Sequence, residues 1–192
     1  ANYIRQLSTE DLYKWTLPFI TGTGDATLEI NPENPQPKPN VGPQFSGVAL
    51  GEDGEPYCVD KSMNMTSADV KETLMGLMPL IQERLKFLTE AAEMVHFMFT
   101  EPAVPPADQI IPKRIDATKT KEVLEAAKEF VAAVFETDHE GAENFAKAKA
   151  EELGIKLGDF MMPIRMAVTG SRVSPPLIGS IHVLGKERSL KR

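Results

Sequence analysis

The chain has 192 residues, of which 42% are hydrophobic and 26% charged, and its net charge is −7. This composition is typical of a globular protein with one domain or two small ones. No run of about 18 apolar residues could cross a membrane, and the N-terminus lacks the pattern of a signal peptide. The single cysteine, Cys58, excludes an intrachain disulfide and fits a reducing compartment. We therefore expect a cytoplasmic protein without membrane contact, and we also expect a monomer.

The first predicted element is a short amphipathic helix at residues 8–20, in which Leu12, Trp15 and Phe19 share one face. Residues 22–66 differ, because they hold six prolines among glycines and acids and show no helical period. Within them, ATLEI and FSGVAL favour short strands, and EDGE favours a turn. We interpret this segment as a Pro/Gly-rich insertion with a small β-hairpin.

The helical period returns at Ser67, which is the predicted N-cap. Pro79 interrupts the pattern, so we expect one helix at about 67–78 and another at about 79–100. Prolines then close this part of the chain. The sequence thus predicts a first helical subdomain over 1–105, with the insertion at about 22–66, and a second over 106–192.

The second subdomain begins with two amphipathic helices, at 118–136 and 139–153. A further helix at about 157–168 ends at Thr169-Gly170. Ser174-Pro175-Pro176 opens a short helix, since proline is tolerated in a first turn, and a last helix begins at GKERSLKR. The predicted fold class is all-α, with two small helical bundles.

Charge is distributed unevenly along these elements. The last 37 residues hold seven basic and two acidic residues, a net charge of +5, so the preceding 155 carry −12. An acidic body with a basic end favours one face that binds an anionic partner. Chance scatter of charges over a short window is the alternative.

No catalytic or metal-binding constellation is visible in the sequence. The three histidines are isolated, Cys58 has no local histidine, and no glycine-rich phosphate loop is present. We therefore predict no catalytic residue, no metal ligand and no cofactor in these 192 residues. Nine methionines at helical spacing suggest a second hypothesis, that the chain is a helical protein-interaction module that binds no RNA. This spacing fits an ordinary hydrophobic core better.

Arg165 and the Ser174-Pro175 turn form the most informative part of the basic end. Two helix ends joined by a tight turn bring backbone amides, a hydroxyl and an arginine into one small region. Arginine presents a planar fork to phosphates or base edges, and single-stranded RNA loops are recognised by stacking and edge hydrogen bonds. Pro175, Leu177 and Ile178 are apolar side chains beside Arg165 that suit an unstacked base. Residue types alone therefore favour RNA-loop binding.

The same residues carry a resemblance to a known family. MPIRMAVTGSRVSPPLIGSIHVLGKERSLKR, at 162–192, resembles the C-terminal end of bacterial glutamyl-tRNA synthetases, which typically read MPLRvAlTG…SPpLfe…lGKer. LMPLIQERLKFLTEAAEMVHFMF, at 77–99, and NYIRQLSTEDLYKWTLPFI, at 2–20, are similar to further segments of that family. The resemblance covers most of the chain and is weakest across 22–66.

This resemblance implies the all-helical anticodon-binding region of a class I aminoacyl-tRNA synthetase. The family attaches glutamate to tRNA-Glu with ATP, and some members also accept tRNA-Gln. Its catalytic domain carries HIGH-type and KMSKS-type motifs, which are absent here, so the chain is expected to be an inactive fragment and ATP to bind elsewhere in the parent.

Roles for individual residues follow from the resemblance. Arg165 matches an arginine placed at the first anticodon bases, and Ser174, Pro175 and Leu177 match the turn that packs against them. Arg84 matches the region where discriminating members sense the third anticodon base. Ile178-Gly179-Ser180 departs from the family's LFE-like pattern. Further expected RNA contacts are Thr169, Arg172, Lys186 and Arg188.

Overall fold

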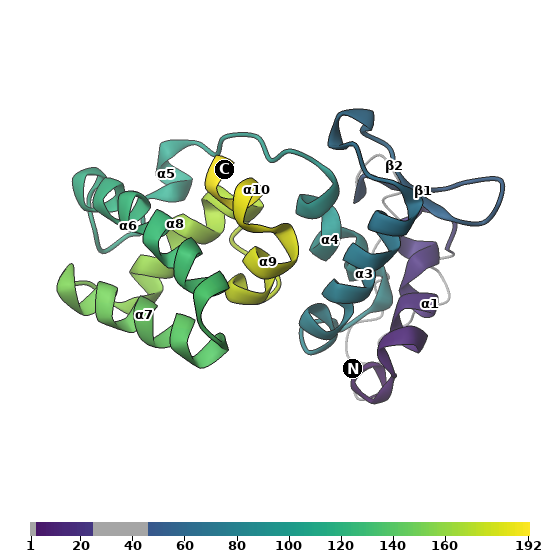
Figure 1. The fold of residues 1–192 in the computed structure, drawn as a ribbon, viewed down its shortest axis with the longest axis horizontal. Helices are drawn as coiled ribbons and strands as arrows, with labels where there is room; N and C mark the ends of the chain where they lie inside the picture. Colours follow the sequence, from purple (N-terminus) through teal and green to yellow (C-terminus); the bar gives the residue numbers. More distant parts are fainter. Residues whose placement is uncertain (1–2, 25–45) are drawn as a thin grey trace. The chain divides into compact units, whose positions relative to one another are not determined.

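The computed structural model describes residues 3–24 and 46–192 and is predominantly helical (Figure 1), which confirms the predicted all-α class. The chain divides into two compact units, Ala1–Glu101 and Pro102–Arg192. The sequence placed the boundary after residue 105, whereas the structure divides the chain after Glu101. Each unit has its own buried core.

Unit 1 is built on three helices that contact one another, α1, α3 and α4. Its helical segments are η1 (Ile4–Gln6), α1 (Thr9–Ile20), η3 (Lys61–Met63), α3 (Ser67–Gln82), η4 (Leu88–Glu90) and α4 (Ala91–Phe99). Ser8 caps α1 by accepting a hydrogen bond from the Asp11 amide. Leu12, Leu74 and Met98, one from each helix, are fully buried and contribute to the core.

Two predictions about α3 were wrong. The N-cap is Thr66 rather than Ser67: the Thr66 hydroxyl accepts from the Asp69 amide, and the Asp69 carboxylate accepts from the Thr66 amide. The helix also continues through Pro79 to Gln82. Proline removes one backbone hydrogen bond, but buried side chains before and after it, Met78 and Ile81, keep this helix packed on its neighbours.

The predicted hairpin is confirmed over the described part of the insertion. Strands β1 (Val48–Leu50) and β2 (Pro56–Cys58) pair antiparallel, with Ala49 opposite Tyr57. The turn at EDGE joins them, and Gly54 adopts a φ of 80° there. The expected strand at ATLEI and the proline-rich PQPKPN lie outside the described residues.

Unit 2 is a helical bundle in which α6, α7 and α8 contact one another and α9 and α10 pack on α6. Its helices are α5 (Ala107–Ile110), α6 (Ala117–Glu136), α7 (His139–Glu152), α8 (Leu157–Thr169), α9 (Leu177–Leu184) and α10 (Lys186–Lys191). Asp116 and Asp138 cap α6 and α7 through their side chains. The Phe130 and Phe160 rings meet edge to face in the core, with centroids 6.0 Å apart.

The methionines do not form an exposed stripe along these helices. Met78, Met98 and Met166 are each at most 2% exposed and belong to the cores of their units. They therefore contribute packing, as the helical spacing favoured.

Candidate nucleic-acid interface

The loop between α8 and α9 begins at a glycine that no other residue can replace without strain. Gly170 caps α8 in the left-handed conformation, with a φ of 67°, and its amide donates to the Met166 carbonyl at 2.9 Å. A Cβ at this position would lie 2.9 Å from Cβ of Pro102. Both the backbone conformation and the available space therefore require glycine.

Arg165 holds the far end of this loop. Its Nη1 donates to the Ser174 hydroxyl and to the Pro175 carbonyl, the latter at 2.9 Å, and lies 3.5 Å from the Ser174 carbonyl. The side chain is half-buried. One nitrogen of the guanidinium thus fixes the turn that opens α9. Arg165 and Ser174 are nine positions apart in sequence, and the contact between α8 and α9 brings them together.

Two hydroxyls brace the middle of the loop. The Thr169 hydroxyl donates to the Arg165 carbonyl at 2.9 Å and accepts from the Ser171 amide at 3.3 Å. The Ser171 hydroxyl accepts from the Val173 amide at 3.1 Å. These local bonds give residues 169–174 a defined conformation without regular secondary structure.

The loop exposes two side chains, Arg172 and Val173. Arg172 is exposed, and its Nη2 donates to the carbonyl of Gln109 at 3.2 Å. Val173 is 64% exposed. Val173 carried no sequence signal, since nothing in the pattern distinguishes an exposed valine in a loop from a buried one. The link to Gln109, 63 positions away, is a tertiary contact that spacing does not encode.

Several residues expected at the site are buried rather than displayed. Ser174 is 3% exposed and Leu177 is 2% exposed, and Pro175 is buried as well. The expected apolar surface of Pro175, Leu177 and Ile178 is therefore packed into unit 2 in this structure. Ser174 and Pro175 serve instead as acceptors for Arg165, and Thr169 is buried at the start of the loop.

The other basic residues expected to contact RNA lie in different places. Lys186, on α10, forms an ion pair with Glu136 at 3.6 Å, and Arg188, also on α10, is half-buried. Arg84 belongs to unit 1, where it is exposed just beyond the end of α3. The structure thus brings Arg165, Ser174 and Pro175 together directly and places Arg84 in the other unit.

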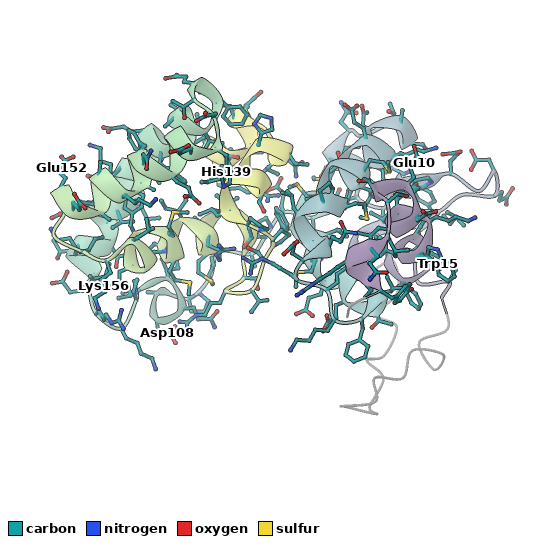
Figure 2. All side chains as sticks on the ribbon, turned by 90° about the horizontal axis from the view of Figure 1, so that it is seen from below. Glu10, Trp15, Asp108, His139, Glu152 and Lys156 are labelled. Carbon is teal, nitrogen blue, oxygen red and sulfur yellow. The ribbon has the colours of Figure 1, made fainter. Side chains whose placement is uncertain are left out.

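Charge is segregated within unit 2. Residues 156–192, which form α8, α9 and α10, carry the net charge of +5, whereas residues 116–152, which form α6 and α7, hold ten acidic and five basic residues, a net charge of −5. Figure 2 shows His139 and Glu152 at the two ends of α7, and Lys156 directly before α8. Hydrogen bonds to the Glu129 and Glu152 carboxylates raise the pKa of Lys149 on the acidic side. The positive net charge of residues 156–192 therefore favours an anion at the segment that forms α8–α10.

Neither a membrane span nor a metal cluster occurs in the described part of the chain. None of the described helices is both long and apolar enough to cross a bilayer. Within residues 3–24 and 46–192, no group of three or more histidine, cysteine or carboxylate side chains could hold a metal ion.

The sequence of residues 50–192 matches a family model described as an anticodon binding domain. The chain belongs to this family. It is also 44% identical over 193 residues to a glutamate–tRNA ligase of Treponema denticola, covering 100% of this chain and 35% of that protein, and 43% identical over 190 residues to one of Roseiflexus sp., covering 99% and 30%. These matches confirm the predicted resemblance.

The fold agrees with a solved relative. A crystal structure of a glutamate tRNA ligase from Elizabethkingia meningosepticum, in complex with its amino acid, matches 99% of this chain and 29% of that one, with a TM-score of 0.50 and 16% identity. The predicted anticodon-binding fold is therefore confirmed. The chain spans about a third of the length of the curated relatives named above.

Proposed function

We propose that this chain is the tRNA anticodon-binding region of a glutamate–tRNA ligase, and that its partner is tRNA-Glu. The parent enzyme would act in the cytoplasm and use ATP to join glutamate to the tRNA, with the ATP chemistry in a part of the enzyme outside these 192 residues. The single observation that carries the proposal is the match of residues 50–192 to an anticodon binding domain. The chain would bind as a monomer.

The geometry supports a binding surface on unit 2 around the α8–α9 loop. Residues 156–192 are positive, which favours phosphate, and Arg172 and Val173 are exposed on a loop that several hydrogen bonds hold in place. Because a preorganised loop loses little conformational entropy on binding, it is suited to an anticodon loop whose bases are splayed apart. Arg165 would act in this site through the turn that it holds, in addition to its charge.

Arg84 in unit 1 is proposed to sense the third anticodon base, as its match to discriminating family members implies. Its side chain is exposed, and its backbone is fixed by a 2.9 Å hydrogen bond from its amide to the Ile81 carbonyl. Arg84→Ala is expected to reduce the preference for tRNA-Glu over tRNA-Gln. An equal loss of affinity for both tRNAs would show that Arg84 contacts only the RNA backbone.

The proposal is tested by titrating the chain with a fluorescent tRNA-Glu anticodon stem-loop at several KCl concentrations. We expect binding that weakens steeply with salt, because phosphate contacts release counterions. A stem-loop whose three anticodon bases are replaced by abasic residues is the matched control and should bind at least about tenfold more weakly, since base contacts provide specificity. No binding, or equal binding of both RNAs, would contradict the proposed function.

A further inference from the structure

Three cationic side chains of unit 1 lie near the C-terminal end of α3. Unit 1 is strongly acidic, with seven basic and 15 acidic residues over 1–101. Three of these seven, Arg5, Arg84 and Lys86, belong to η1 or to the segment that directly follows α3, and all three are exposed. An exposed cationic cluster on an otherwise acidic unit indicates a local surface for an anion.

Gln82 connects the two segments that carry these cations. Its Nε2 donates to the Ile4 carbonyl at 2.9 Å and to the Leu7 carbonyl at 2.7 Å, and so ties both ends of the η1 segment to the last residue of α3. Ile4 is 2% exposed, which anchors the segment further. The guanidinium of Arg5 then reaches the carbonyl of Glu83, 78 positions away, at 3.5 Å.

The segment after α3 is held as firmly as η1. The Arg84 amide donates to the Ile81 carbonyl, and the Glu90 carboxylate accepts from the Lys86 amide at 2.8 Å and from the Phe87 amide at 3.3 Å. The Glu90 carboxylate is thus directed at the backbone, which leaves Glu83 as the exposed acid within this segment. The C-terminal end of a helix also favours nearby cations through its dipole.

We propose that Arg5, Arg84 and Lys86 form a second RNA-contact surface, at which Arg5 and Lys86 bind phosphates of the same tRNA beside the base-reading Arg84. This inference rests on the proposed function, because it supposes a tRNA partner. Gln82 is a positioning residue in this surface: it holds the segment that carries Arg5 against the end of α3 and does not contact the RNA itself.

The decisive experiment measures the affinity of the whole 192-residue chain for a tRNA-Glu transcript as a function of KCl. Arg5→Gln is expected to lower the affinity about fivefold at low salt and to reduce the slope of log K against log salt by about 0.7 to 0.9, the contribution of one phosphate contact. Lys86→Gln should act in the same way. Both substitutions should weaken the binding of a non-cognate tRNA by the same factor as that of tRNA-Glu, since phosphate contacts carry no sequence information.

Lys71→Gln is the matched control, because Lys71 is an exposed cation on α3 of the same unit but far from its C-terminal end. It should leave both affinity and slope unchanged. Arg5→Lys keeps the charge and should keep the slope. Gln82→Met should weaken binding while Arg5 is still present, and circular dichroism should confirm that each variant remains folded.

The outcomes separate this inference from the proposed function. If the wild-type chain binds tRNA-Glu and Arg5→Gln and Lys86→Gln behave like Lys71→Gln, this surface is not an RNA contact and the inference is overturned, while anticodon binding stands. If the wild-type chain does not bind the tRNA, both fail together. A reduced slope in Arg5→Gln and Lys86→Gln, but not in Lys71→Gln, supports the inference.

Discussion

The two units use similar helices but carry very different charge. Unit 1 has a net charge of −8, and three of its seven cations lie near the C-terminal end of α3. Unit 2 has a net charge of +1, because the −5 of residues 116–152, on α6 and α7, cancels the +5 of residues 156–192, on α8–α10, and residues 102–115 add +1. The total charge of −7 therefore says little about partners. The distribution within each unit indicates where we expect an anionic partner to approach.

The units also differ in how they position arginine. In unit 2, Arg165 donates to the turn between two helices, so that the loop and the arginine form one structure. In unit 1, Arg84 is exposed just beyond the end of α3, and it is its backbone amide that donates a hydrogen bond, to the Ile81 carbonyl. Changes at Arg165 should therefore affect both the loop and RNA binding, and changes at Arg84 should affect binding alone.

The largest expected effect comes from Arg165→Ala. Loss of a charged side chain with several hydrogen bonds at the loop should weaken binding of the tRNA-Glu stem-loop by about 10- to 100-fold, or about 1.4 to 2.7 kcal/mol. Arg165→Lys keeps the charge but not the planar fork, and should restore only part of the affinity. The helical circular dichroism signal should persist in both. Unchanged affinity in Arg165→Ala would remove Arg165 from the binding site.

Gly170→Ala tests whether the loop conformation matters independently of charge. A Cβ at a φ of 67° and 2.9 Å from Pro102 should destabilise unit 2 by about 1 to 2 kcal/mol. Differential scanning calorimetry should show a lower transition temperature for unit 2 and an unchanged one for unit 1. Gly154→Ala is a matched control, because Gly154 also has a φ of 67° but a Cβ there meets no atom within 4 Å. Equal affinity of Gly170→Ala and wild type for the stem-loop would show that RNA binding does not depend on the conformation of the loop.

A smaller effect is expected for Arg172→Gln. Its exposed guanidinium should contribute one phosphate contact, so the salt slope should fall by about 0.7 to 0.9 and the affinity by about two- to fivefold. Lys147→Gln, on the acidic side of unit 2, is the control and should change neither quantity. If Lys147→Gln weakened binding as much, the distinction between the two sides of unit 2 would be wrong.

The smallest effect belongs to unit 1 and should leave RNA binding unchanged. Hydrogen bonds from the Thr66 hydroxyl and then from the Thr66 amide lower the pKa of Asp69 below its ordinary 3.8. Since the folded-state pKa is the lower one, this stabilisation is present above the unfolded value and disappears as pH falls through the folded one. Thermal melts at pH 7 and pH 3 should show a smaller acid-induced decrease in melting temperature for Asp69→Asn than for wild type. The same loss in both would contradict the prediction.

The helices of unit 2 could be predicted closely because local signals agreed. Asp116 and Asp138 are typical N-caps, and buried side chains recur at helical spacing after them. Pro79 misled the prediction, because proline usually ends a helix and only tertiary packing on both sides of it keeps α3 continuous. The four-residue helix α5 was not expected, since four residues are too few to show a period.

The candidate site was predicted by residue but not by geometry. Arg165, Ser174 and Pro175 were identified from residue type and family resemblance, yet their mutual hydrogen bonds depend on the packing of α8 against α9. The burial of Leu177 and the exposure of Val173 have the same origin. A loop sequence does not specify which of its apolar residues faces the core, and this limited the prediction of the contact surface.

The central claim is that tRNA binds the basic α8–α10 side of unit 2 through the α8–α9 loop. Hydrogen–deuterium exchange of the 192-residue chain, with and without tRNA-Glu, tests it most directly. We predict that tRNA slows exchange of the amides of residues 170–174 and of Leu177 and leaves those of α7 (His139–Glu152) unchanged. Slower exchange across α7 with no change at residues 170–174 and Leu177 would contradict the account.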